Sequence, residues 1–114
     1  MIVGKQWGTT EAKIQTPLFE MHRLEVLPEM RCSMHKHERK WNAFAVISGA
    51  LIIEVEREGC GLTQTVLRAG DVTAVRPGEF HRFVTGLSPA VALEMYYPDV
   101  LSEDIIRRDV GGHL

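Results

Sequence analysis

Most of the chain alternates between apolar and polar positions in short segments that end at turn residues. In the clearest segment Leu51, Ile53 and Val55 point one way and the intervening positions the other, which is the two-residue period of a half-buried strand. Ser48-Gly49 interrupts the pattern before it, and Pro77-Gly78, a pair that type II turns favour, follows a later segment. These signals predict extended segments over residues 18–26, 31–37, 42–56 (divided at Ser48-Gly49), 62–67, 72–75, 81–85 and 90–97.

Many short strands joined by Gly/Pro turns predict an all-β sandwich or barrel. Only the tail, residues 99–108, has helical character, with Asp99 as a candidate cap and Glu103 and Asp104 in the first turns. A length of 114 residues is typical of one domain, so we expect a single domain over residues 1–114.

Composition excludes several classes of protein. The hydrophobic fraction of 45% and the charged fraction of 25% are those of a globular chain and argue against disorder. Thirteen Lys and Arg against fifteen Asp and Glu give a net charge of -2 with no basic run, so neither a nucleic-acid nor an anionic-membrane partner is indicated. The longest uncharged run, residues 41–53, is shorter than the roughly 20 residues that span a bilayer. No apolar signal core and no C-x-x-C pair are present, so we expect a reduced, cytoplasmic protein.

The histidines carry the candidate chemistry. If residues 31–37 are extended, His35 and His37 lie on the same face, while Cys32 lies on the opposite, outer face. In the next strand Asn42 shares its face with the apolar residues at positions 44 and 46. His81, after the Pro-Gly turn, can point into the same interior from a distant strand.

His35-x-His37, followed by Asn42 after four residues and Gly49 after six more, resembles the first signature motif of the cupins. That motif reads H-x-H, three or four residues, Glu, six residues, Gly. Residues 70–81, from Gly70 through the Arg-Pro-Gly turn to His81, resemble the second motif. The resemblance implies a cupin double-stranded β-helix, a jelly-roll barrel. It also implies one divalent metal ion, with His35, His37 and His81 as its ligands.

Position 42 departs from the cupin pattern, because the family places a carboxylate ligand where this chain has Asn42. An amide is a neutral and weaker donor, and Glu38 is on the wrong face to replace it. Three imidazoles still suit Zn, Ni, Cu, Fe or Mn, with open positions for water or a ligand. Whether Asn42 coordinates or only neighbours the ligands is left open, as is the identity of the metal.

A narrower resemblance extends over nearly the whole chain, to the cupin domain of type II mannose-6-phosphate isomerases. It is carried by Trp7-Gly8, Ser33, residues 46–49 and the acidic and basic tail at 102–109. It implies a sugar-phosphate isomerase, although that family usually has Gln at the position of His35.

An isomerase needs a base beside the metal. The sequence offers Glu79 and Glu94 as candidate catalytic residues and Lys40, Arg82 and Arg107 as candidate substrate-binding residues, Arg107 for a phosphate. Two alternatives stay open: a three-histidine metal-dependent dioxygenase, and a non-catalytic cupin that binds a small molecule or sugar.

The expected partners are a small-molecule ligand, with a sugar phosphate implied by the resemblance, and a second copy of the chain. Small barrels leave strand edges exposed, and a homodimer would cover them. An apolar-rich set near the histidine segment could supply the contact: Met30, Cys32, Met34 and Trp41.

Overall fold

The computed structural model describes residues 1–99, 106, 108 and 110–114, and within them the chain forms strands and no helix. The nine strands are β1 (Ile2–Lys5), β2 (Gly8–Thr16), β3 (Phe19–Val26), β4 (Lys40–Ser48), β5 (Ala50–Arg57), β6 (Gly61–Arg68), β7 (Val72–Val75), β8 (His81–Val84) and β9 (Ala90–Pro98). The predicted all-β architecture is confirmed. The predicted helix over residues 99–108 lies almost wholly outside the described residues.

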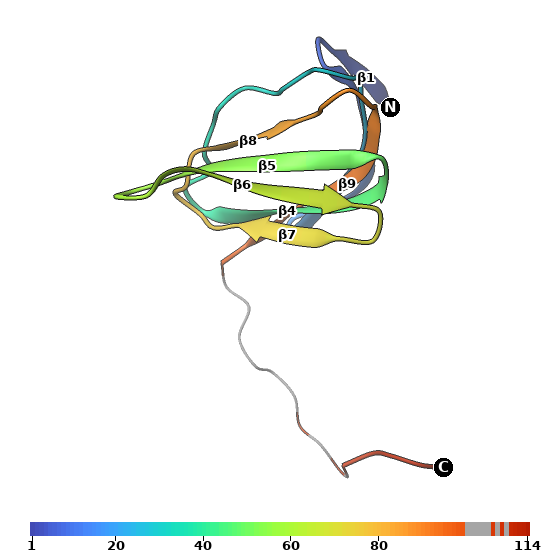
Figure 1. Ribbon diagram of the computed structural model, residues 1–114. Coiled ribbons are helices and arrows are strands. Elements are labelled where there is room, and N and C mark those ends of the chain that lie inside the picture. Colours follow the sequence, from blue (N-terminus) through green and yellow to red (C-terminus); the bar gives the residue numbers. More distant parts are fainter. Residues whose placement is uncertain (100–105, 107, 109) are drawn as a thin grey trace.

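Two antiparallel sheets form the barrel (Figure 1). The larger sheet has the order β1-β2-β3-β9-β4-β7 and the smaller has the order β6-β5-β8. Each contributes apolar side chains to one shared core. Its buried members are Leu24, Val26, Phe44, Val46, Leu51, Ile53, Val55, Leu67, Val75, Phe83, Ala90 and Ala92.

The alternation read from the sequence matches the burial of the central strands. In β5, Leu51, Ile53 and Val55 all enter the core, as predicted. Glu54, on the outer side of β5, is nevertheless only 6% exposed. Its carboxylate accepts hydrogen bonds from Arg82 Nε at 2.7 Å and from Gln64 Nε2 at 2.7 Å, so the buried charge is compensated.

The N-terminal hairpin β1–β2 was not predicted. Its residues are mostly exposed or half-buried, so β2 lacks the apolar alternation that marks a strand buried on one face. A bulge between Ala12 and Ile14 further breaks the period. The hairpin pairs with β3 and extends the larger sheet past the core.

The segment 31–37 was predicted as extended, and it differs from a regular strand. It makes two isolated bridges to β8, Arg31 with Val84 and His35 with His81. Cys32 is also not on the outer face, because its side chain packs against the core and its Sγ accepts a hydrogen bond from Phe83 N at 3.2 Å.

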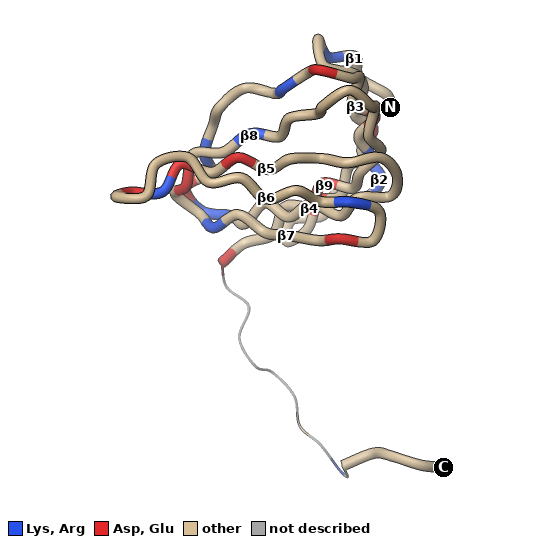
Figure 2. The backbone as a smooth tube through the Cα atoms, in the orientation of Figure 1, with Lys and Arg blue, Asp and Glu red and all other residues tan. Residues whose placement is uncertain are grey.

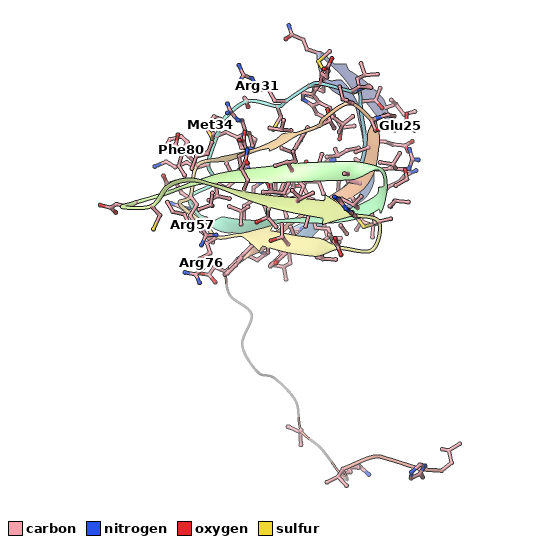
Figure 3. The ribbon with its side chains drawn as sticks, in the orientation of Figure 1. Glu25, Arg31, Met34, Arg57, Arg76 and Phe80 are labelled. Atoms are coloured by element: carbon pink, nitrogen blue, oxygen red, sulfur yellow. The ribbon has the colours of Figure 1, made fainter. Side chains whose placement is uncertain are left out.

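The surface carries both signs of charge, interspersed along the backbone rather than gathered on one face (Figure 2). Side chains such as those of Arg31, Arg57 and Arg76 project outward from the barrel (Figure 3). In the part of the chain that the structure describes, no helix is long and apolar enough to cross a bilayer.

Candidate metal centre

His35 and His37 lie between β3 and β4, and His81 begins β8. Backbone hydrogen bonds join the two segments in both directions, from His35 N to His81 O at 3.0 Å and from His81 N to His35 O at 2.8 Å. Gly78 N, in the turn before β8, also donates to His37 O at 2.7 Å and extends this backbone contact to His37. Residues far apart in the sequence are therefore held opposite each other by main-chain bonds.

The three imidazoles converge. Their ligand nitrogens all lie within 4.8 Å of one another. The ring centroids are 4.8 Å apart for His35–His81, 5.1 Å for His35–His37 and 5.5 Å for His37–His81. Three imidazoles gathered in this way are a common ligand set for a divalent transition metal.

His37 provides the first test of whether these residues suit a metal. Its Nε2 is buried and has no hydrogen-bond partner, which is costly for a polar atom unless a ligand satisfies it. Burial, followed by the nearby charges of Lys40 and the other two histidines, lowers the pKa of His37 to about 4. The ring is therefore neutral at ordinary pH, and a neutral imidazole has one nitrogen whose lone pair can bind a metal ion.

His81 provides the second test. Its Nδ1 lies 2.9 Å from Glu79 O and its Nε2 lies 2.8 Å from Asn42 Oδ1, so both ring nitrogens face oxygen atoms. A neutral imidazole has only one N–H, and burial lowers the pKa of His81, so one of these two contacts lacks a proton. A cation bound between His81 Nε2 and Asn42 Oδ1 would satisfy both atoms.

His35 and Asn42 are already oriented. His35 Nδ1 lies 2.7 Å from Ser33 O, so this nitrogen carries the proton and Nε2 is left free. Asn42 Nδ2 donates to Glu94 Oε2 and to Met95 O, both at 3.3 Å, which turns Oδ1 toward His81. The four side chains fit a divalent metal ion.

Glu94 and Tyr96 of β9 extend this polar cluster. Glu94 is only 8% exposed, and burial raises the pKa of its carboxyl group, although hydrogen bonds to Tyr96 and Asn42 oppose the shift. Burial, reinforced by the neighbouring Glu94, also raises the pKa of the Tyr96 hydroxyl. A carboxyl group with a raised pKa beside a metal site is suited to accept and return a proton.

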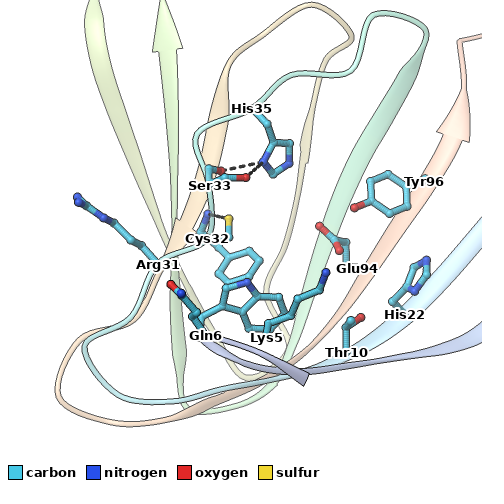
Figure 4. A pocket seen from close by; sticks show the side chains of 12 residues that line it. Lys5, Gln6, Thr10, His22, Arg31, Cys32, Ser33, His35, Glu94 and Tyr96 are labelled. Atoms are coloured by element: carbon cyan, nitrogen blue, oxygen red, sulfur yellow. Dashed lines mark hydrogen bonds between the residues drawn. The ribbon is translucent and has the colours of Figure 1, made fainter. Parts of the chain in front are cut away.

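A cavity of about 670 Å³ opens beside the histidines (Figure 4). His35, Glu94 and Tyr96 form one part of its wall. The remaining lining comes from His22, the segment 31–33, Phe83 and, on the N-terminal hairpin, Lys5, Gln6, Trp7 and Thr10. One candidate metal ligand, His35, and the candidate proton carrier Glu94 therefore border one space large enough for a small molecule.

Among the described residues, the other predicted catalytic and substrate-binding candidates, Glu79, Lys40 and Arg82, do not line this cavity. Glu79 contributes its backbone oxygen to His81, while its carboxylate lies 3.8 Å from Arg57 Nε. Lys40 Nζ lies 4.1 Å from the centre of the Tyr96 ring. Arg82 pairs with Glu54 on the outer side of the smaller sheet, and Arg107 lies outside the described residues.

The cavity wall from the hairpin was missed by sequence reasoning. No sequence motif includes Lys5, Gln6 and Thr10. Their position beside the histidines depends on how β1 and β2 pair. The only sequence signal is the Trp7-Gly8 pair, which was noted for its resemblance alone.

The family model described as "Cupin domain" matches residues 22–96. No protein with a curated function matches the chain in sequence. Among solved structures, KdgF from Halomonas sp. is similar, with a TM-score of 0.74, 17% identity and 86% of each chain covered.

Two further solved structures carry small ligands. CapF with the inhibitor 3-isopropenyl-tropolone aligns at a TM-score of 0.77 and 17% identity, over 86% of this chain and 30% of CapF. Oxalate oxidase in complex with glycolate aligns at a TM-score of 0.62 and 24% identity, over 70% of this chain and 42% of the oxidase. At these identities the likeness concerns the fold.

Proposed function

The chain belongs to the cupin family, and from this premise we propose that it is a metal-dependent protein that holds a small, oxygen-rich organic molecule in the barrel. His35, His37 and His81 bind one divalent metal ion, and Asn42 Oδ1 lies beside them as a neutral fourth donor. The remaining coordination positions of the metal ion would be available to the small molecule.

The observation that carries this proposal is the buried, unpartnered Nε2 of His37, in a cluster of three histidines whose ligand nitrogens lie within 4.8 Å of one another. Such an atom destabilises a fold by about 1–3 kcal/mol unless it is satisfied. A bound metal ion removes that cost and uses the free Nε2 of His35 as well. A purely structural histidine at position 37 would instead pair this buried nitrogen with a protein group.

We propose a proton-transfer reaction next to a carbonyl group, the chemistry of an aldose–ketose isomerase. When bound, the metal ion would polarise the oxygen atoms of such a substrate. Glu94 lines the same cavity and, because burial raises its pKa, holds a proton more readily than an ordinary glutamate. Its carboxyl group is the candidate that moves the proton, with Tyr96 fixing its orientation.

The ligands of two structural neighbours are consistent with this substrate class. Glycolate and a tropolone both present two adjacent oxygen atoms, as a hydroxy-aldehyde or hydroxy-ketone does. The sugar phosphate implied by the narrower resemblance also has adjacent oxygens, and mannose 6-phosphate and fructose 6-phosphate are therefore the first substrates to test.

Metal analysis of untagged protein tests the site. We expect about one divalent ion per chain in the wild type and in His113→Ala, which removes an exposed histidine far along the chain from the cluster, and none in His37→Ala. Metal retained by His37→Ala, or absent from the wild type after loading, contradicts the proposal.

The reaction is tested by exchange with deuterated solvent of the proton next to the carbonyl group, at C2 of mannose 6-phosphate or at C1 of fructose 6-phosphate. We expect exchange in the metal-loaded wild type and its loss in Glu94→Gln, while both bind metal equally. Consumption of O2 with Fe(II) would instead indicate the dioxygenase alternative. Ligand-dependent stabilisation with neither activity would indicate a binding module.

We also propose a homodimer formed through exposed strand edges. The edge strands β1, β6 and β7 carry the exposed apolar residues Ile2, Val66 and Val72. Light scattering across a concentration series tests this, and a monomer at all concentrations contradicts it.

A further inference from the structure

The hairpin β1–β2 supplies a wall of the cavity that lies outside the region matched by the family model. The family model covers residues 22–96, whereas Lys5, Gln6, Trp7 and Thr10 precede it. Side chains that line a cavity from outside the region matched by the family model are well placed to influence which ligand this particular chain accepts.

Trp7 fixes this wall against the barrel. Its ring packs edge-on against Phe83 with a centroid separation of 4.8 Å, and its backbone oxygen accepts a hydrogen bond from Leu27 N at 2.8 Å. Gly8 follows at φ +148°, where a Cβ atom would collide with the backbone oxygen of Glu25. Only glycine permits this close approach, so Lys5 and Gln6 are held at a defined place on the cavity rim.

The wall is rich in groups that bind anions. Lys5 brings an ammonium group, while Gln6 and Thr10 bring an amide and a hydroxyl. Within the part of the chain that the structure describes, no carboxylate pairs with Lys5. The only acidic residue lining the cavity is Glu94, on the side of the histidines.

Figure 4 shows the direction of these side chains. Lys5 extends into the cavity toward the side of Glu94, whereas the guanidinium of Arg31 points away from it. An unpaired ammonium group directed into a cavity would be stabilised by a negative group on the ligand.

We propose that Lys5, assisted by Gln6 and Thr10, binds an anionic group at one end of the ligand while the other end faces the histidines. The proposal rests on the proposed function and narrows it to substrates with a carboxylate or a phosphate remote from their adjacent oxygen pair.

Three small acids that share an α-hydroxycarboxylate end test the proposal. Glycerate has a neutral hydroxymethyl group at its other end, malate has a carboxylate there, and 3-phosphoglycerate has a phosphate. Calorimetric titration of the metal-loaded protein at low salt should give affinities roughly tenfold higher for malate, 3-phosphoglycerate or both than for glycerate. Their order distinguishes a carboxylate site from a phosphate site.

Lys5→Met keeps the length of the side chain and removes its charge. It should abolish the preference for the anionic probes and leave glycerate binding unchanged, and Lys5→Arg should restore the preference. Lys13→Met makes the same change on the same hairpin, where Lys13 pairs with Glu11 and does not line the cavity, and should retain the preference.

The outcomes separate this proposal from the proposed function. Any of three results overturns the anion site. The wild type binds all three acids with equal affinity, neither anionic probe binds measurably, or the preference survives Lys5→Met. If malate still binds more tightly than glycerate through Lys5 after the metal is removed, the anion site stands and the metal-dependent function fails. If glycerate binding requires the metal but no preference exists, only the anion site fails.

Discussion

Replacing Asn42 by Asp tests the arrangement of the candidate metal centre most directly. The substitution restores a carboxylate at the position where the cupin motif has one and changes the size of the side chain very little. It also removes the Nδ2 group, which donates hydrogen bonds to Glu94 Oε2 and to Met95 O, both at 3.3 Å. We therefore expect opposite effects in the metal-free and metal-bound protein.

The magnitude follows from burial. Asn42 is 1% exposed, so its two acceptors lose their donor in a place that water does not reach. A buried polar atom left without a partner costs about 1–3 kcal/mol, and the length of these bonds favours the lower end. Adding the proximity of a second carboxyl group, Glu94, we expect the metal-free variant to be destabilised by about 2–4 kcal/mol, which lowers Tm by roughly 8–17 °C.

The metal-bound variant gains a charged ligand. We expect Asn42→Asp to bind Zn at least about tenfold more tightly than the wild type, which adds about 1.4 kcal/mol to the stabilisation by metal. Thermal unfolding with EDTA and with excess Zn measures both effects. Asn42→Leu is the control, because it loses the same donor without adding charge and should be destabilised without a stronger response to metal. An equal Zn-induced rise in Tm for Asp, Leu and wild type would refute the assignment of position 42 to the metal centre.

Three further predictions concern single groups. Burial raises the pKa of the Cys32 thiol to about 11, so at pH 8 only about a thousandth of it is thiolate. Iodoacetamide should therefore label the exposed Cys60 before Cys32, as followed by mass spectrometry. Equal labelling rates of the two cysteines would contradict this. Hydrogen bonds from Arg82 and then Gln64 lower the pKa of Glu54 from its ordinary value of 4.5. Its contribution to the stability of the fold is therefore complete above pH 4.5 and is lost as the pH falls through the lowered pKa. Glu54→Gln should therefore cost about 1–3 kcal/mol in urea unfolding at pH 7, and the gap from the wild type should close in acid; a constant gap would refute the ion-pair explanation. Gly49→Ala, at φ +75° and against the backbone of Pro89, should lower the free energy of unfolding by more than about 2 kcal/mol. Gly59→Ala, at φ +77° with open space around it, should lower it by about 1 kcal/mol. Equal losses of stability would refute the steric argument.

Much of the barrel could be predicted because its central strands are buried on one face. Leu51, Ile53 and Val55 alternate in the sequence and all enter the core, so pattern and burial agree. The positions of His35, His37 and His81 followed from the motif spacing, and they converge. The sequence could not show that His35 and His37 lie on a segment bonded to β8 only at isolated bridges, because that geometry is set by tertiary contacts.

The hairpin shows what pattern reasoning misses. Both faces of β1 and β2 are at least partly exposed, so no hydrophobic period distinguishes them from a loop. Lys5 reaches the cavity through strand pairing and through the packing of Trp7 on Phe83, residues far apart in the sequence. Such proximity is a property of topology, and one sequence alone contains no signal for it.

The charge balance of the site connects the substitution at position 42 with the cavity wall. Three imidazoles and an amide would leave the charge of a divalent ion uncompensated by its protein ligands, unlike a ligand set with a carboxylate at position 42. An anionic ligand would then supply the compensation that a carboxylate at position 42 normally provides, with Lys5 attracting its other end. Because coupling between two binding sites is reciprocal, an anion that binds the metal-loaded protein more tightly must also tighten the binding of metal by the same factor. A metal affinity that does not rise in the presence of malate would show that the two sites are independent.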